Sequence, residues 1–326
     1  MPLELVLSEP HKIELREYKD LNIGSNEVKI KSLFSSPKHG TEIHAYQGDK
    51  QLTEKYFDPE YKLHRSYTDK YTNKIYPKIL GNITVGTIIE TGNLVKDFKN
   101  GDLVYSHLPI REIHIFNTKD QLLSKQQGSF IREKKLNHVP LELNNMDIVC
   151  LDPAHFALAA LKDAKVNVGD NIAIFGMGAI GLIAVQLAKI SGCQNIIAID
   201  PKSNRRSKAK KLGATHTINP EEGDVGMQVK DLTNKKGVDV SLEISGNYDA
   251  LQEAIRSTHY SGLVVTASYY SGNTSNIKFG EEWHHTRVTI KSSMPVWGNP
   301  SRDYPQWNNS RIEDTILKLM MDKKIN

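Results

Sequence analysis

One short segment constrains the fold of this chain more than any other: Gly176-Met177-Gly178-Ala179-Ile180-Gly181. A continuous apolar run, Ile172–Phe175, precedes it and is typical of a strand buried on both faces. Apolar residues then repeat with helical spacing at Ile180, Ile183, Ala184, Leu187 and Ala188. Glycines at these three places allow a tight turn, a close approach of the backbone to a ligand, and close packing of the helix on the strand. The segment therefore predicts a strand–turn–helix unit whose helix begins against a ligand.

An acidic residue stands where such a unit needs one. Asp200 follows a second apolar run, 196–199, at the spacing of roughly 20 residues that dinucleotide-binding units use. In those units the helix N-terminus attracts a pyrophosphate, and the acid accepts hydrogen bonds from ribose hydroxyls. Because a carboxylate there repels a 2′-phosphate, the sequence predicts NAD rather than NADP. We expect all six residues of the turn and Asp200 to contact this cofactor, with Arg205 on the following helix as a further candidate.

Strands and helices alternate through the rest of the second half. Further strands are expected at 217–218, 238–242, 263–266 and 288–290, and helices at 225–232 and 248–256. This alternation predicts βαβ units around a doubly wound parallel sheet. The chain is therefore predicted to be α/β, with a Rossmann domain over residues 151–300.

Composition and charge exclude several classes of protein. The 42 basic and 38 acidic residues are mixed along the chain, which argues against a nucleic-acid partner. The densest basic run, Lys202–Lys211, is typical of a solvated helix face. No apolar run approaches the roughly 18 residues of a membrane helix, and no signal-peptide core begins the chain. With only Cys150 and Cys193, which we interpret as buried thiols, we expect a cytoplasmic protein without a membrane partner.

The first half of the sequence shows a different pattern, in which short predicted strands alternate with turns. Strands are expected at 28–31, 84–90 and 103–105. Three segments, 40–44, 86–92 and 98–104, resemble the GroES-like catalytic domain of medium-chain dehydrogenases, and with the glycine turn the resemblance spans essentially the whole chain. It implies a GroES-like β domain over residues 1–150, and a hydride transfer between NAD(H) and a secondary alcohol or ketone. It also implies a homo-oligomer. Members of this family close with a segment that returns from the Rossmann domain to the catalytic domain, and we expect residues 301–326 to be the start of a truncated version of it.

A narrower likeness is carried by four short motifs. They resemble the bacterial guloside 3-dehydrogenase branch of this superfamily: Pro37–Glu42, Leu80–Asn82, Asp152–Ala154 and Asp303–Trp307. That branch interconverts a hydroxyl at C3 of a sugar and a ketone. The resemblance therefore implies a small carbohydrate substrate, a hexoside oxidised or reduced at C3.

The chain departs from the family at its metal sites. Zinc-type members place a cysteine ligand where this chain has His39, and a histidine and glutamate where it has Asn82 and Ile83. Four thiolates for a structural zinc cannot come from two cysteines. His39 and Asp152, with His155 or Glu42 as a third ligand, are the candidates that remain for a catalytic zinc. The sequence leaves open whether any zinc binds.

Hydride removal from an alcohol requires a base for the hydroxyl proton and a group that stabilises developing negative charge. By resemblance, Lys38 and His39 occupy the loop that holds the metal in relatives. We hypothesise that one of them polarises the C3 oxygen and moves its proton while Asp152 orients the pair. Thr41 corresponds to the hydroxyl that relays protons in relatives.

Two other functions agree with the sequence. One is a polyol or threonine dehydrogenase with a degenerate zinc site. The other is a nucleotide-binding paralogue without catalysis, which the loss of zinc ligands would permit. The retained polar residues Lys38, His39 and Thr41 favour an enzyme over such a paralogue.

Overall fold

The computed structural model describes residues 1–326 except 51–53, 59, 68–74, 120–134 and 295–306. The chain divides into two compact units, Met1–Asp152 (unit 1) and Pro153–Asn326 (unit 2). Residues 303–306 of the Asp303–Trp307 motif lie outside the described residues. Among the helices of the described part, none combines the length and the apolar character needed to cross a bilayer.

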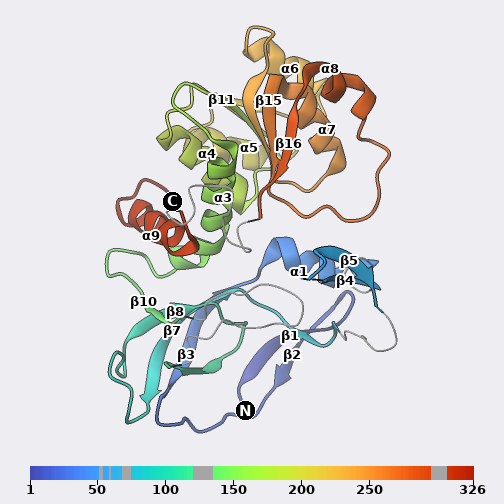
Figure 1. Ribbon diagram of the computed structural model, residues 1–326. Coiled ribbons are helices and arrows are strands. Elements are labelled where there is room, and N and C mark those ends of the chain that lie inside the picture. Colours follow the sequence, from blue (N-terminus) through green and yellow to red (C-terminus); the bar gives the residue numbers. More distant parts are fainter. Residues whose placement is uncertain (51–53, 59, 68–74, 120–134, 295–306) are drawn as a thin grey trace. The chain divides into compact units, whose positions relative to one another are not determined.

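Unit 1 is built from antiparallel strands. Five of them form a sheet in the order β10-β8-β7-β3-β9, three form a second sheet in the order β2-β1-β6, and β4 pairs with β5 (Figure 1). The strands are β1 (Leu3–Glu9), β2 (Lys12–Glu17), β3 (Glu27–Ser36), β4 (Lys55–Asp58), β5 (Leu63–Ser66), β6 (Lys78–Ile79), β7 (Ile83–Thr91), β8 (Leu103–Ser106), β9 (Ile113–Asn117) and β10 (Asn137–His138). The helical elements are α1 (His39–Tyr46) and the 3-10 turn η1 (Asp147–Cys150).

The five-stranded sheet buries one face in its own core. Strand β3 pairs with β7, and Ile30 lies opposite Ile88. Both side chains are almost fully buried and pack with Val104 of β8 and Phe116 of β9. This is the core of the predicted GroES-like β domain, and α1 follows the end of β3 after two residues.

Unit 2 contains the predicted parallel sheet (Figure 1). Its strand order is β13-β12-β11-β14-β15-β16, which is the order of the Rossmann fold. The strands are β11 (Asn171–Phe175), β12 (Asn195–Ile199), β13 (His216–Ile218), β14 (Val238–Glu243), β15 (Thr258–Thr266) and β16 (Thr289–Ser292). The helices are α3 (Leu151–Ala164), α4 (Ala179–Ile190), α5 (Ser203–Leu212), α6 (Val225–Leu232), α7 (Tyr248–Ser257), α8 (His284–Thr286) and α9 (Asn309–Met321), with a π-helical turn η2 (Phe279–Trp283). The first two residues of α3, Leu151 and Asp152, still belong to unit 1.

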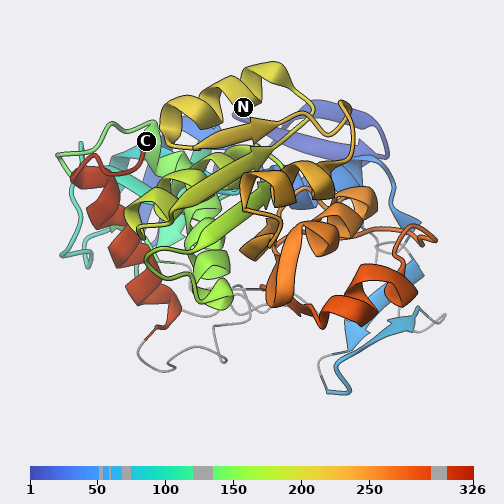
Figure 2. The ribbon, with the colours of Figure 1, turned by 90° about the horizontal axis from the view of Figure 1, so that it is seen from above.

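Helices cover both faces of this sheet. Helices α4 and α5 contact each other and the strands β11, β12 and β13, whereas α6 and α7 contact each other and α7 packs on β14 and β15. Figure 2 shows helices on both sides of the strands of unit 2. The doubly wound α/β architecture predicted from the alternation is therefore confirmed.

One strand is longer than the pattern predicts. Strand β15 starts at Thr258, directly after α7, and not at residue 263. Ser261 has a positive φ of 59°, and the pairing with β14 shifts register nearby. This irregularity hides the alternation of the early residues, so the sequence shows only the regular second half of the strand.

Candidate active site

The glycine turn of unit 2 adopts the geometry that its sequence predicts. Gly176 has a φ of +96°, and its N–H donates to the carbonyl of Ile199 at 2.8 Å. A Cβ at Gly181 would lie 1.9 Å from the carbonyl oxygen of Gly176, so α4 packs against the turn as only glycine allows. A Cβ at Gly178 would meet nothing within 4 Å, so this glycine faces open space.

Gly178 is also the N-cap of α4. It has no side chain to accept the N–H groups of the first turn, and α4 carries no acidic residue in that turn. These N–H groups and the helix dipole favour an anion. The combination of an open glycine and an uncapped helix start fits a pyrophosphate.

Asp200 follows β12 and lies against this turn. Its Oδ2 accepts the backbone N–H of Met177 at 2.8 Å, and its Oδ1 accepts that of Lys202 at 2.8 Å. The Nη1 of Arg205 lies 3.4 Å from Oδ2, and Asp200 is only 3% exposed. The structure thus brings Asp200, Arg205 and the turn together. It also gives Asp200 a task that sequence reasoning did not predict, because the carboxylate holds the turn in place.

A second carboxylate lies at the same edge of the sheet and was missed by sequence reasoning. Glu243 ends β14 and is fully buried. It accepts hydrogen bonds from the backbone N–H groups of Ser245 at 2.8 Å and Gly246 at 3.2 Å, and from the hydroxyls of Ser245 and Tyr270. The signal that could have identified it is an acidic residue at the end of a strand whose last residues are otherwise uncharged and buried.

In unit 1, Lys38 and Asp152 form an ion pair. The Nζ of Lys38 lies 3.4 Å from Oδ1 of Asp152, and the carboxylate is buried. Lys38 precedes α1, and its backbone N–H donates to Oε2 of Glu42 at 2.9 Å. Oε1 of the same glutamate accepts the N–H of Gly81 at 2.7 Å. Glu42 therefore joins the start of α1 to the loop before β7 and fixes the backbone of Lys38.

The two other predicted catalytic residues have a different environment. His39 and Thr41 lie in the first turn of α1, and both are exposed. No hydrogen bond or ion pair joins the ring of His39 to another residue in the described part of the chain. The structure thus brings together Lys38 and Asp152 but leaves the His39 ring outside this pair.

The donor set does not fit a tetrahedral zinc ion. The carboxylate of Asp152 faces the Lys38 ammonium, and that of Glu42 is taken by two backbone N–H groups. His155 is buried in unit 2, with its Nδ1 3.8 Å from Oε1 of Glu313. Across the described ranges, no three His, Cys, Asp or Glu side chains gather as a metal site requires.

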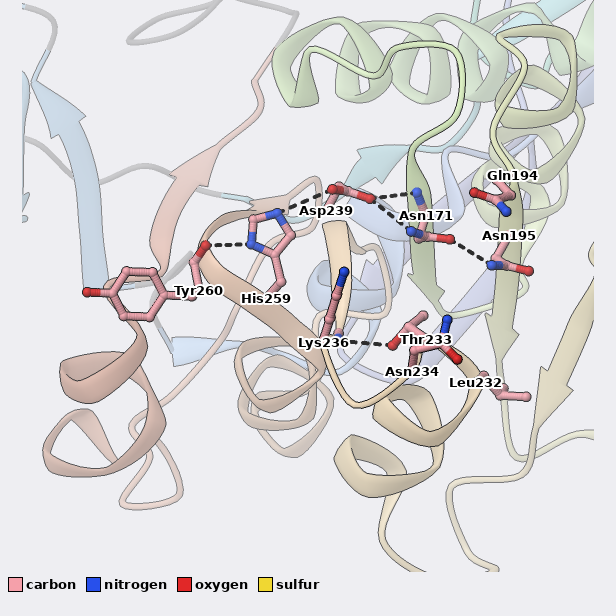
Figure 3. Close-up of a pocket in the computed structure, with 11 residues that line it drawn as sticks. Asn171, Gln194, Asn195, Leu232, Thr233, Asn234, Lys236, Asp239, His259 and Tyr260 are labelled. Carbon is pink, nitrogen blue, oxygen red and sulfur yellow. Dashed lines mark hydrogen bonds and ion pairs between the residues drawn. The ribbon is translucent and has the colours of Figure 1, made fainter.

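A cavity of about 600 Å³ lies at the opposite, amino-terminal edge of the parallel sheet. Figure 3 shows a chain of polar side chains there, in which Asn195 donates to Asn171, Asn171 donates to Asp239, and His259 contacts Asp239 at 3.2 Å. These contacts join the starts of β12, β11, β14 and β15. None of the predicted site residues lines this cavity, so its polar groups serve the sheet edge rather than the predicted chemistry.

Comparisons with known proteins agree with this organisation. Residues 179–310 match the family model described as zinc-binding dehydrogenase. The D-guloside 3-dehydrogenase of Escherichia coli (strain K12) is 36% identical over 325 residues, which covers 99% of this chain and 89% of that protein.

Solved structures show the same fold. The 2R,3R-butanediol dehydrogenase of Bacillus subtilis superposes with a TM-score of 0.72 at 22% identity, over 99% of this chain and 88% of that one. A protein of Sinorhizobium meliloti 1021, solved bound to NADP, gives a TM-score of 0.71 at 19% identity, over 100% of this chain and 90% of that one. The turn, the sheet order and the full-length similarity lead to one conclusion: the chain belongs to the zinc-binding, medium-chain dehydrogenase family.

Proposed function

We propose that this dehydrogenase transfers a hydride between NAD(H) and C3 of a hexoside. The observation that carries the proposal is the ion pair between Lys38 and the buried Asp152. By resemblance, Lys38 lies in the loop where zinc-type relatives hold their metal. The 36% identity to D-guloside 3-dehydrogenase supports a sugar as the substrate.

Unit 2 supplies the residues for the cofactor. The open face of Gly178 and the uncapped start of α4 fit the pyrophosphate, and Asp200 holds the turn from the end of β12. The carboxylate of Asp200 disfavours a 2′-phosphate, which supports NAD over NADP. When bound, NADH supplies the hydride and NAD⁺ accepts it.

Unit 1 supplies the proton. In the direction of reduction, the Lys38 ammonium donates a hydrogen bond to the C3 ketone oxygen and gives up its proton as negative charge develops there. In the direction of oxidation, the neutral amine accepts the proton of the C3 hydroxyl. Asp152 orients the amine, because a buried carboxylate pairs best with a cation in one fixed position. A cationic side chain thus takes over the charge stabilisation that zinc provides in relatives.

The decisive experiment is an assay of NADH oxidation with a methyl 3-keto-hexoside, with and without a chelator. We expect turnover that survives the chelator and falls when NADPH replaces NADH. Turnover abolished by the chelator, and restored by zinc, would show that a metal rather than Lys38 polarises the oxygen. If the protein turns over polyols or threonine but no 3-keto-hexoside, the sugar assignment is wrong.

A further inference from the structure

Glu243 is a buried carboxyl group whose described partners are all uncharged. It is 0% exposed, and all four of its hydrogen-bond donors are neutral: two backbone N–H groups and two hydroxyls. No lysine, arginine or histidine of the described residues forms an ion pair with it. Within the part of the chain that the structure describes, a negative charge at this position is therefore stabilised only by the dipoles of these donors.

Two effects oppose each other at this carboxyl group. Burial raises the pKa of Glu243, because a charge in a poorly polarisable interior is costly. The hydrogen bonds from Ser245 and Tyr270 favour the ionised form and offset part of this rise, but the pKa of Glu243 remains above its usual range. Burial and the neighbouring carboxylate also raise the pKa of Tyr270, so its hydroxyl keeps its proton and remains a donor. Four donors therefore stabilise the ionised form of Glu243, and a nearby positive charge, which the described residues do not supply, would stabilise it further.

The location of Glu243 indicates where a countercharge would come from. Strands β11 and β14 are neighbours in the sheet, and Phe175 lies opposite Glu243. After β11 the chain continues to β12 on one side of this pair, and after β14 it continues to β15 on the other side. Ligands of doubly wound sheets bind at such a switch point, outside the carboxyl ends of the strands. Glu243 lies at the carboxyl end of β14.

The segment after Glu243 also contacts the glycine turn. The N–H of Ile244 donates to the carbonyl of Phe175 at 3.0 Å. A Cβ on Gly176 would lie 3.1 Å from both the Cβ and the nitrogen of Ser245. Residues 244–246 therefore form the wall beside the turn, and two of their N–H groups are held by Glu243.

We propose that Glu243 is a positioning residue that selects the oxidation state of the cofactor, with its carboxylate as the countercharge of the oxidised nicotinamide ring. The inference rests on the proposed binding of NAD. NAD⁺ carries a positive charge on this ring and NADH does not, so only the oxidised form compensates a buried negative charge. The hydrogen bonds from Ser245, Gly246 and Tyr270 hold the carboxylate at the switch point.

The test compares the affinities of the two oxidation states. Glu243→Gln keeps the size of the side chain and removes its charge. The dissociation constants of NAD⁺ and NADH are measured by calorimetry and by NADH fluorescence at pH 7, without substrate. We expect the ratio of the NAD⁺ constant to the NADH constant to rise about tenfold in this variant, as the loss of one charge at short range in a protein predicts.

Two further variants separate charge from structure. Tyr270→Phe and Ser245→Ala keep the carboxyl group but remove a donor that favours its ionised form. Both should shift the ratio in the same direction as Glu243→Gln, and by less. If Glu243→Gln does not fold, Tyr270→Phe carries the test, since the loss of one hydroxyl leaves the packing of the ring in place.

A purely structural role makes a different prediction. If Glu243 only shapes residues 244–246, the affinities for NAD⁺ and NADH fall in parallel and their ratio stays constant, which would overturn the inference. Failure of the proposed function is a separate result: the wild-type protein would then bind neither nucleotide. A wild-type protein that binds both, with an unchanged ratio in the variants, refutes only the role of Glu243.

Discussion

An ammonium group held against a buried carboxylate has a fixed position and a fixed partner, and this distinguishes Lys38 from its neighbour. His39 follows it directly in the sequence, yet its ring is exposed at the first turn of α1. The main chain turns into the helix at this point, so consecutive side chains leave in different directions. At the scale of single residues, the structure therefore favours Lys38 as the proton donor.

Exchange of Lys38 for Met should lower kcat by about 100-fold or more, the usual contribution of a positioned acid–base group. NADH affinity should stay unchanged, because the cofactor residues lie in unit 2. The measurement is steady-state reduction of a methyl 3-keto-hexoside together with NADH titration by fluorescence. His39→Ala is the matched control and should lower kcat far less. An equal loss in both variants would contradict the assignment to Lys38.

Two glycines of the turn give a second matched pair. Gly181→Ala would place a methyl group 1.9 Å from the Gly176 carbonyl, so we expect a lower Tm and loss of NADH binding together. Gly178→Ala meets no atom within 4 Å and has an ordinary negative φ of −76°, so its Tm should match the wild type. Its NADH affinity should nevertheless fall, because the methyl group occupies the space offered to the pyrophosphate.

Thermal unfolding followed by circular dichroism, and fluorescence titration with NADH, would check both variants. Wild-type NADH affinity in Gly178→Ala would show that the cofactor does not approach this glycine.

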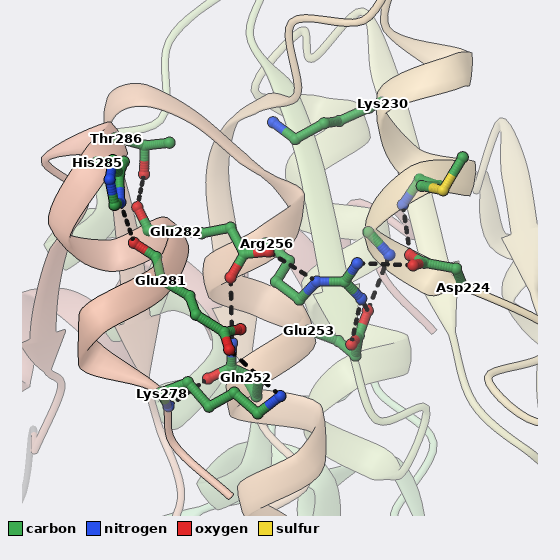
Figure 4. A network of polar contacts seen from close by, with 12 residues as sticks. Asp224, Lys230, Gln252, Glu253, Arg256, Lys278, Glu281, Glu282, His285 and Thr286 are labelled. Atoms are coloured by element: carbon green, nitrogen blue, oxygen red, sulfur yellow. Dashed lines mark hydrogen bonds and ion pairs between the residues drawn. The ribbon is translucent and has the colours of Figure 1, made fainter.

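At the scale of elements, one arginine joins three segments of unit 2. Arg256 of α7 contacts Asp224, the N-cap of α6, at 2.6 Å, Glu253 of α7 at 2.7 Å, and Glu282 of η2 at 3.2 Å (Figure 4). Asp224 also accepts the N–H of Met227 and so caps α6. The hydrogen bond from Arg256 lowers the pKa of Asp224 below its usual 3.8. This network connects the helices that cover one face of the sheet.

Arg256→Met should lower the free energy of unfolding by about 1 to 2 kcal/mol near pH 7. The figure is small for three ion pairs because the side chains are partly exposed and solvent screens their charges. The pKa of Asp224 is depressed in the folded state, so its contribution is complete above the unfolded value of 3.8 and disappears as pH falls through the folded value. The difference between the two proteins should therefore shrink below about pH 4.

Urea unfolding at a series of pH values measures this difference. Lys278→Met is the control, because Lys278 and Glu281 form an exposed pair 3.5 Å apart in the same region and should contribute almost nothing. A difference for Arg256→Met that persists unchanged at pH 3 would contradict the role of Asp224.

At the scale of the whole molecule, stability should respond to the nucleotide and not to a chelator. NADH at a hundred times its dissociation constant should raise the free energy of unfolding by roughly 2.7 kcal/mol, because it binds only the folded chain. A chelator should leave the Tm unchanged, since the described donor set does not fit zinc. Thermal scans of wild type and Gly178→Ala with NADH, with chelator, and with both would check this. A chelator-induced drop in Tm that zinc reverses would contradict it.

Much of unit 2 was predictable from the sequence because its signals are local. The run Ile172–Phe175 and the three glycines of the turn each depend on backbone geometry and burial within a few residues. Helix α6 begins and ends where its apolar spacing predicts. The start of β15 was not predictable in this way, because a positive φ at Ser261 interrupts the regular alternation on which the prediction depends.

The sequence by itself thus determined the strand–turn–helix unit, the α/β class and the resemblance to medium-chain dehydrogenases. The tertiary structure alone decided which polar groups meet. Lys38 and Asp152 are 114 positions apart, and Glu243 and Tyr270 are 27 apart, so neither pair leaves a periodic trace in the sequence. Such long-range partners meet only when distant parts of the chain pack together. Burial then removes water from the polar groups, and each of them must find a hydrogen bond or an ion pair because an unpaired buried polar group is costly.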